Sequence, residues 1–117
     1  MNNIEELLEQ LTKLRNSNRL VIVEGKKDKA CLEKFDIIKV QTLKEPIYKV
    51  VEEISKESKE VVILTDLDSE GKKLFSKLRR HLQEHGVTID NQFREFLFKK
   101  TKLRQIEGLA RYINNSS

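Results

Sequence analysis

The stretch VVILTDLDSEGKKL, residues 61–74, joins an apolar run to two aspartates that stand one residue apart. The run at residues 61–65 is rich in β-branched residues and lacks apolar–polar alternation, which is typical of a strand covered on both faces. In an open parallel sheet, ligands bind beyond the carboxyl ends of the strands. The stretch therefore predicts a buried strand that delivers Asp66 and Asp68 to one edge of a sheet.

A second apolar run, LVIV at residues 20–23, has the same character and ends in Glu24-Gly25. Shorter candidate strands lie at residues 37–40 and 87–89. Helical periodicity predicts helices at residues 3–16 and 26–35, behind Pro46, and from the second aspartate to Gly86. Helices and strands therefore alternate along the chain.

This alternation predicts an α/β fold, a Rossmann-like three-layer sandwich around a central, mainly parallel four-stranded sheet. Two more helices, near residues 91–99 and 103–113, give a short C-terminal extension. The chain has 117 residues and no repeats or Pro/Gly-rich linker, so we expect a single domain. Its core spans about residues 19–90, with an N-terminal helix at 3–16 and a basic helical extension at about 91–114.

Composition limits the setting of the protein. The chain is 36% charged and 38% hydrophobic, which is typical of a globular domain. It contains no apolar run near the ~20 residues that span a membrane, so no membrane partner is expected. Cys31 is the only cysteine and cannot form an internal disulfide, which favours a reducing, cytoplasmic location.

Charge is distributed unevenly along the chain. Residues 1–71 hold 12 Lys/Arg against 15 Asp/Glu, whereas residues 72–111 hold 11 against four, a net charge of +7. A basic half favours a polyanionic partner, with nucleic acid the leading case. The alternative is a set of Lys-rich helix faces exposed to solvent, as in thermophile proteins.

The predicted sheet brings Glu24, Asp66 and Asp68 toward one edge. Three carboxylates in a small space repel one another and lose hydration, so they are costly unless a cation joins them. Oxygen ligands suit a hard ion such as Mg²⁺ or Mn²⁺. The sequence therefore predicts a divalent-metal site that meets phosphate oxygens.

Simpler roles exist for the same residues. Asp68 or Ser69 is suited to cap the following helix. Gly25 and Gly71 fit tight turns that bring the backbone close to a ligand. Four lysines flank the two acidic turns and either begin solvated helices or reach for phosphates: Lys26, Lys27, Lys72 and Lys73. Cations in a first helical turn oppose the helix dipole, which favours the phosphate interpretation.

Other sites are not supported by the sequence. Gly71-Lys72 lacks the spacing of a Walker-type loop. His81 and His85 lie one helical turn apart without a third ligand nearby. The phenylalanines and tyrosines stand mostly at core spacing, so no base-stacking platform is expected.

The segments VIVEGKKD and VVILTDLDSEG together resemble the Toprim domain, which is shared by bacterial-type primases, type IA and type II topoisomerases, OLD-family nucleases and small ribosomal-RNA maturases. The resemblance covers about residues 19–90. The small size of the chain is similar to the stand-alone, primase-like Toprim proteins of archaea and bacteria. The basic tail FREFLFKKTKLRQIEGLARYI resembles the archaeal members.

The resemblance implies a role for each matching position. Glu24 would act as general acid or base, and Asp66 and Asp68 would hold Mg²⁺. Asp28 matches an acidic position that orients the site, unless it only begins a helix. Glu70 stands where topoisomerases often carry Arg-Glu-Gly, with Ser69 in place of the basic residue. The supporting residues are thus Gly25, Asp28, Glu70 and Gly71, and the expected nucleic-acid contacts are Lys26, Lys27, Lys72, Lys73, Lys99, Lys100, Lys102 and Arg104.

The chain departs from the larger Toprim enzymes. It has no strand-cleaving tyrosine domain, zinc-binding module or polymerase-like subdomain. The leading hypothesis is therefore a Mg²⁺-dependent, nuclease-like protein that acts on RNA or DNA, in RNA processing or DNA repair. The alternatives are a non-catalytic binding module in a primase, repair or ribosome-associated complex, and phosphotransfer on a small phosphate ester. The sequence leaves the choice of RNA or DNA, the protein partners and the oligomeric state open.

Overall fold

The computed structural model describes residues 3–116. Six α-helices and four strands alternate, and a short 3₁₀ helix precedes the last helix. None of the helices in this range is both long and apolar enough to cross a bilayer. The elements are α1 (Asn3–Ser17), β1 (Leu20–Val23), α2 (Lys26–Glu33), β2 (Val40–Thr42), α3 (Ile47–Glu57), β3 (Glu60–Ile63), α4 (Ser69–Glu84), β4 (Thr88–Ile89), α5 (Gln92–Lys100), η1 (Ile106–Gly108) and α6 (Leu109–Ser116).

The four strands form one sheet in the order β2-β1-β3-β4. Every neighbouring pair is parallel, and Val21 of β1 stands opposite Val40 of β2 and Val62 of β3. The predicted parallel α/β fold is confirmed. Because β1 and β3 are adjacent and central, Glu24 and Asp66 emerge side by side at the carboxyl edge.

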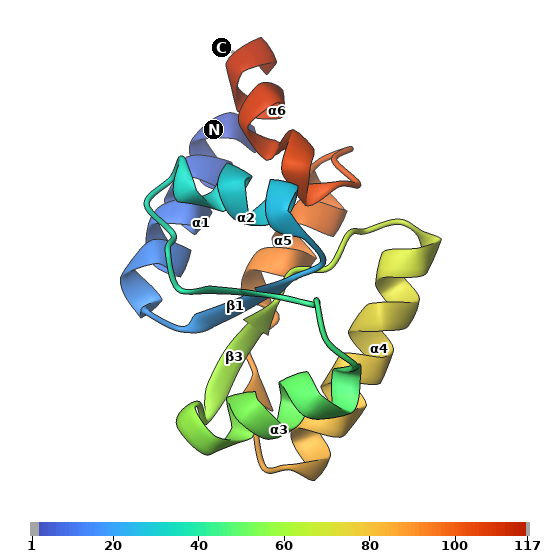
Figure 1. The fold of residues 1–117 in the computed structure, drawn as a ribbon. Helices are drawn as coiled ribbons and strands as arrows, with labels where there is room; N and C mark the ends of the chain where they lie inside the picture. The colour runs from blue at the N-terminus through green and yellow to red at the C-terminus, as the bar shows by residue number, and fades with distance from the viewer. Residues whose placement is uncertain (1–2, 117) are drawn as a thin grey trace.

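Helices cover both faces of the sheet, which gives three layers (Figure 1). Side chains alternate along β1: Val21 and Val23 enter one core, and Ile22 enters the other. The first core packs against α1, α2, α5, η1 and α6, and the second against α3 and α4. Cys31 is buried in the first core as a free thiol. Burial on both faces explains why the strand sequences are continuously apolar.

The second strand lies later than predicted. β2 runs from Val40 to Thr42, although the Lys39 carbonyl just before it already accepts from the Val21 N–H of β1 at 2.9 Å. The turn after α2 explains the shift, because Asp36 adopts a positive φ of 60° and the Ile37 N–H donates to the Leu32 carbonyl at 3.2 Å. Ile37 is buried as the apolar residue that closes this turn, so its hydrophobicity reflects helix termination.

The helix boundaries follow the predicted signals with small differences. Pro46 is the N-cap of α3 and precedes the first helical residue. Gly86 closes α4 with a φ of +77°, and the Val87 N–H donates to the Leu82 carbonyl at 2.9 Å. This pair of features is the usual glycine-closed end of a helix, as predicted.

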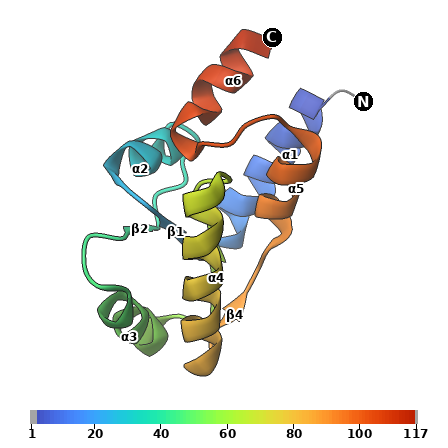
Figure 2. The ribbon, with the colours of Figure 1, turned by 90° about the vertical axis from the view of Figure 1, so that its right-hand side faces the viewer.

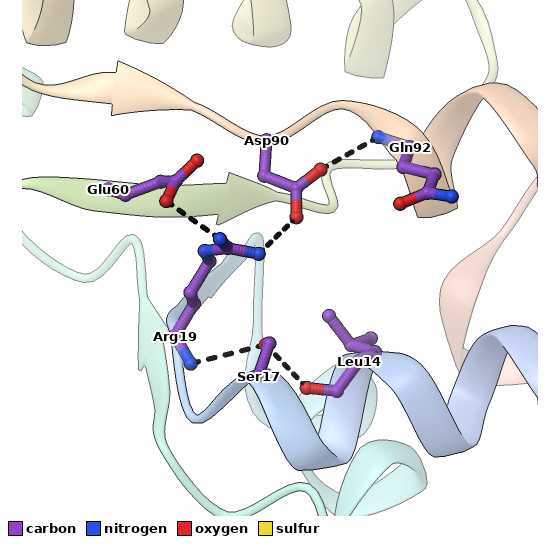
Figure 3. A network of polar contacts seen from close by, with 6 residues as sticks. All are labelled: Leu14, Ser17, Arg19, Glu60, Asp90 and Gln92. Carbon is purple, nitrogen blue, oxygen red and sulfur yellow. Dashed lines mark hydrogen bonds and ion pairs between the residues drawn. The ribbon is translucent and has the colours of Figure 1, made fainter.

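Arg19 links three elements at the amino end of the sheet, opposite the acidic edge (Figure 3). Its guanidinium contacts Glu60 at 2.8 Å and Asp90 at 2.7 Å. The Arg19 backbone N–H also donates to Ser17 Oγ at 3.3 Å. Partly exposed pairs of this kind contribute up to about 1 kcal/mol each. Glu60 and Asp90 therefore share one basic partner at this end.

Candidate metal and nucleic-acid site

Glu24 and Asp66 meet where β1 and β3 end. Glu24 Oε2 accepts a hydrogen bond of 2.7 Å from the Asp66 backbone N–H. Both side chains are half-buried. The contact follows from the parallel pairing of the two central strands. It fixes the orientation of the Glu24 carboxylate beside the loop of residues 64–68, which carries Asp66 and Asp68 and is called the aspartate loop below.

Asp68 caps α4, which is the simpler of the two roles that the sequence suggests for this residue. Its Oδ1 accepts from the Gly71 N–H at 2.8 Å, and Asp68 is the N-cap residue of the helix. Asp66 Oδ1 instead accepts from the Ile106 N–H of η1 at 2.9 Å. Each aspartate therefore uses one carboxylate oxygen to accept from a backbone N–H. The donors differ, so the two carboxylates are held by different segments of the chain.

Burial and like charges perturb the acidic groups. Burial raises the pKa of Glu24, and the negative charges of Asp66 and Asp68 raise it further. Asp66 has a raised pKa for the same main reason, with added repulsion from Asp68 and Glu107. Burial also raises the pKa of Asp28 to about 6, against the opposing effect of its hydrogen bond with the Gly25 N–H. The carboxylates thus form one electrostatic cluster.

The donor set fits a weakly held, hydrated cation. Within residues 3–116, the second oxygen of Glu24, Asp66 and Asp68 makes no hydrogen bond. Over the same residues no three His, Cys, Asp or Glu side chains converge closely enough to enclose a metal ion. Mg²⁺ commonly binds through one or two carboxylates and keeps several waters. The residues fit that mode and do not fit a closed, all-protein cage.

Arg94 of α5 is a site residue that the sequence analysis missed. It is 6% exposed and donates through Nη2 to the Asp66 carbonyl at 3.0 Å and through Nη1 to the Thr65 carbonyl. Its guanidinium lies 4.5 Å from the centre of the Phe75 ring. Burial lowers the Arg94 pKa, while the charges of Glu24 and Asp66 raise it. The sequence held one signal for this residue, because Arg94 is a cation directly next to Phe93 in a predicted helix with an apolar stripe.

The two predicted glycines differ in the space around them. A Cβ on Gly71 would lie 1.9 Å from the Asp66 carbonyl oxygen, so the close approach of α4 to the aspartate loop requires glycine. A Cβ on Gly25 would meet no atom within 4 Å. Protein packing therefore explains Gly71 but not Gly25.

The C-terminal segment closes over the aspartate loop. The predicted helix at residues 103–113 begins later, since η1 starts at Ile106 and α6 at Leu109. The Leu67 N–H donates to the Arg104 carbonyl at 2.7 Å, which holds residues 101–105 extended against the loop. Glu107 of η1 adds a negative charge beside Asp28 and Asp66. The sequence analysis missed Glu107 because it lies 39 residues beyond Asp68.

The predicted basic residues are all exposed and occupy several places. Lys72 and Lys99 line one cavity between α4 and α5. Lys102 and Arg104 line a second cavity, about 480 Å³ in volume, together with Asp68. Lys27 lines a third with Glu107. The remaining predicted residues lie at helix ends: Lys26 and Lys73 near the starts of α2 and α4, Lys100 at the end of α5, and Glu70 in the first turn of α4.

Comparisons with known proteins concern the family and the fold. The family model described as the Toprim domain matches residues 19–100. A UPF0292 protein of Methanocaldococcus jannaschii is 32% identical over 93% of this chain and 88% of its own length. A UPF0292 protein of Pyrococcus horikoshii is 38% identical over 85% of this chain and 75% of its own length.

Two solved structures share the fold. A putative protein from Aquifex aeolicus superposes with a TM-score of 0.79 at 32% identity, covering 85% of this chain and 94% of that one. The zinc-binding and RNA polymerase domains of the Aquifex aeolicus primase give a TM-score of 0.55 at 23% identity, covering 91% of this chain and 28% of that one. The second likeness concerns the fold alone.

Proposed function

The chain belongs to the Toprim domain family, whose members typically bind Mg²⁺ and serve nucleic-acid chemistry, and from that premise we propose that it carries out Mg²⁺-dependent phosphodiester chemistry on nucleic acid. The observation that carries this proposal is the contact between Glu24 and the Asp66 backbone at 2.7 Å. It supports a site in which acidic groups from two adjacent strands act together. Basic side chains around the same edge support a polyanionic substrate.

Asp66 and Asp68 would hold the ion through the oxygens that they do not use for backbone contacts. When bound, Mg²⁺ supplies positive charge that polarises a phosphate and stabilises the charge that develops on it. Arg94 holds the Thr65 and Asp66 carbonyls, which fixes the direction in which the Asp66 side chain leaves the strand. The C-terminal segment limits movement of the same loop through Ile106.

Glu24 is the proposed general acid or base. Its raised pKa brings its protonation closer to neutral pH, which suits a group that exchanges a proton during catalysis. The Asp66 N–H holds Oε2, so Oε1 would accept a proton from an attacking water or donate one to a leaving oxygen. Loss of this carboxylate should therefore lower the rate of cleavage more than it lowers affinity for nucleic acid.

A second candidate is a binding module without catalytic activity, acting within a primase, repair or ribosome-associated complex. One observation favours it: over residues 3–116 no three potential metal ligands form a preassembled cage. In that case the basic cavities would bind nucleic acid or a protein partner, and metal would be dispensable. The two candidates differ in whether binding and cleavage require Mg²⁺.

The experiment compares native protein with Asp66→Asn on labelled RNA and DNA, with Mg²⁺ and then with Mn²⁺. Calorimetric titration measures metal binding on the same samples. Asp36→Asn is the matched control, because Asp36 is exposed and has a positive φ that asparagine adopts readily. We expect Asp66→Asn alone to lose metal binding and cleavage. Metal-independent binding without cleavage in both proteins would favour the binding module.

A further inference from the structure

A cavity of about 300 Å³ lies between α4 and α5, beside the aspartate loop. Its apolar lining comes from Leu67, Phe75 and Phe98. Leu67 stands between the two aspartates in sequence, so the cavity adjoins the candidate metal site. Figure 2 shows α4 in front, with α5 beside the half of the helix that follows this loop. The volume is at the lower limit of the ~300–1,000 Å³ typical of small-molecule sites.

Basic side chains continue the cavity along α4. Lys72 and Ser76 line the cavity and also line a groove of about 460 Å³ on the outer face of the helix. The other residues of that groove are Lys73, Lys77 and Arg80. Because the cavity and the groove share two residues, they form one continuous surface. The apolar cavity lies at one end of this surface, and the cations of the groove form a row along the rest of it. Glu95 contributes a carboxylate to the cavity.

Phe98 is the aromatic ring available to a ligand in this cavity. It is 44% exposed, whereas Phe93 and Leu97 of the same helix are buried. The Lys72 ammonium lies 4.6 Å and the Arg104 guanidinium 5.2 Å from its ring centre, and both side chains are exposed. Phe75 is less available, because it lies against Arg94, which is held by two carbonyl groups.

We propose that the α4–α5 surface binds single-stranded nucleic acid, with one unpaired base stacked on Phe98 and the flanking phosphates on the cations of α4. This proposal rests on the proposed function and names the substrate class of the same site. Lys72 leaves the ring for a phosphate oxygen when the strand binds, because a phosphate is a stronger partner for a cation than an exposed ring. Arg104 stays in place, because its Nη1 donates to the Thr101 and Leu103 carbonyls at 3.2 Å and 2.8 Å. Phe98 then presents its face to the base.

The cavity selects single strands because a base inside a duplex is already stacked and paired. Base–aromatic stacking needs an unpaired base and is tolerant of sequence. The cations of α4 supply the non-specific, salt-dependent part of the affinity. Since Leu67 lines the cavity, the backbone next to the stacked base lies beside Asp66 and Asp68. The strand would thus run from the anchored base toward the candidate metal site.

The test measures binding of fluorescent twelve-nucleotide RNA and DNA strands by anisotropy in EDTA, so that metal chemistry plays no part. Phe98→Ala should weaken binding about five- to one-hundredfold, the range for loss of one stacked base. Tyr48→Ala is the matched control, because Tyr48 is an exposed aromatic on α3, 70% exposed, and should bind like the native chain. Phe98→Trp keeps a stacking ring and should bind as tightly as the native chain or more tightly.

Two further arms separate the base from the phosphates. A strand of abasic nucleotides should bind equally to native and Phe98→Ala protein. The Lys73→Gln/Lys77→Gln double variant should lower the slope of log affinity against log salt by about 0.7 for each lost phosphate contact. The Lys49→Gln/Lys56→Gln double variant on α3 is the charge-matched control and should leave the slope unchanged.

Equal affinity of native and Phe98→Ala protein for the single strand overturns the proposal. So does an equal loss of affinity for a blunt duplex, because no base is available there. If strand binding persists while metal binding fails, only the catalytic proposal is wrong. If Mg²⁺-dependent cleavage persists without any effect of Phe98, only the present inference is wrong.

Discussion

Replacing Arg94 with methionine tests whether the buried guanidinium fixes the aspartate loop. Methionine keeps most of the apolar volume against Phe75 but removes both donors to the Thr65 and Asp66 carbonyls. Hydrogen bonds from a charged donor contribute about 1.5–3 kcal/mol each, and removing one partner leaves the other buried without a bond. Burying the charged guanidinium also costs free energy, and this burial lowers the Arg94 pKa. Methionine carries no charge, so the variant avoids that cost and regains part of the lost stability.

We therefore expect Arg94→Met to lower the free energy of unfolding by about 2–4 kcal/mol. With an unfolding entropy of ~2.1 cal/mol/K per residue, a chain of 117 residues would melt about 8–16 °C lower. The control is Arg79→Met, because Arg79 is exposed and lies 5.8 Å from the centre of the same Phe75 ring. Urea denaturation followed by circular dichroism measures both. Equal stability of the two variants would refute the role assigned to Arg94.

Three other predictions follow from the same edge of the sheet. Gly71→Ala should destabilise the fold by about 3 kcal/mol in urea denaturation, because its Cβ would lie 1.9 Å from the Asp66 carbonyl oxygen, whereas Gly25→Ala should have little effect. Asp28→Asn should stabilise the chain by about 1–2 kcal/mol at pH 7 and not at pH 4. The folded-state pKa of about 6 lies above the ordinary 3.8, so the stability that Asp28 contributes is present below 3.8 and lost as the pH rises through 6. Mg²⁺ should raise the melting temperature of native protein but not of Asp66→Asn, and the effect should shrink as the pH falls, because the raised pKa values of Glu24 and Asp66 let these carboxylates take up protons more readily.

The sequence predicts the fold well where burial dictates the pattern. Strands β1 and β3 are apolar on both faces, which marks them as central, and Gly86 marks the end of α4. The prediction is wrong at the second strand, because Ile37 is buried by a helix-closing turn. Hydrophobicity alone cannot separate an apolar residue that closes a helix from one that begins a strand, since both are buried.

The candidate site is less fully predicted. Glu24, Asp66 and Asp68 follow directly from the strand ends, because parallel neighbours end at the same edge. Arg94 and Glu107 reach that edge from α5 and η1, which come after the last strand. The position of Glu107 depends on how residues 101–105 pack against the aspartate loop, and that packing rests on backbone contacts such as the one between Leu67 and Arg104. The spacing of apolar side chains in the sequence does not reflect such backbone contacts, so it cannot predict them.

The two ends of the sheet treat charge in opposite ways, and the difference bears on function. At the amino end, Glu60 and Asp90 both form a direct ion pair with the partly exposed Arg19. At the carboxyl end, Glu24 and Asp66 repel other carboxylates, and Arg94 bonds to backbone carbonyls instead of to either carboxylate. Uncompensated anions lower the stability of the free chain. A ligand that brings positive charge would offset that cost, which supports the proposal that a cation binds at the edge where the two central strands end.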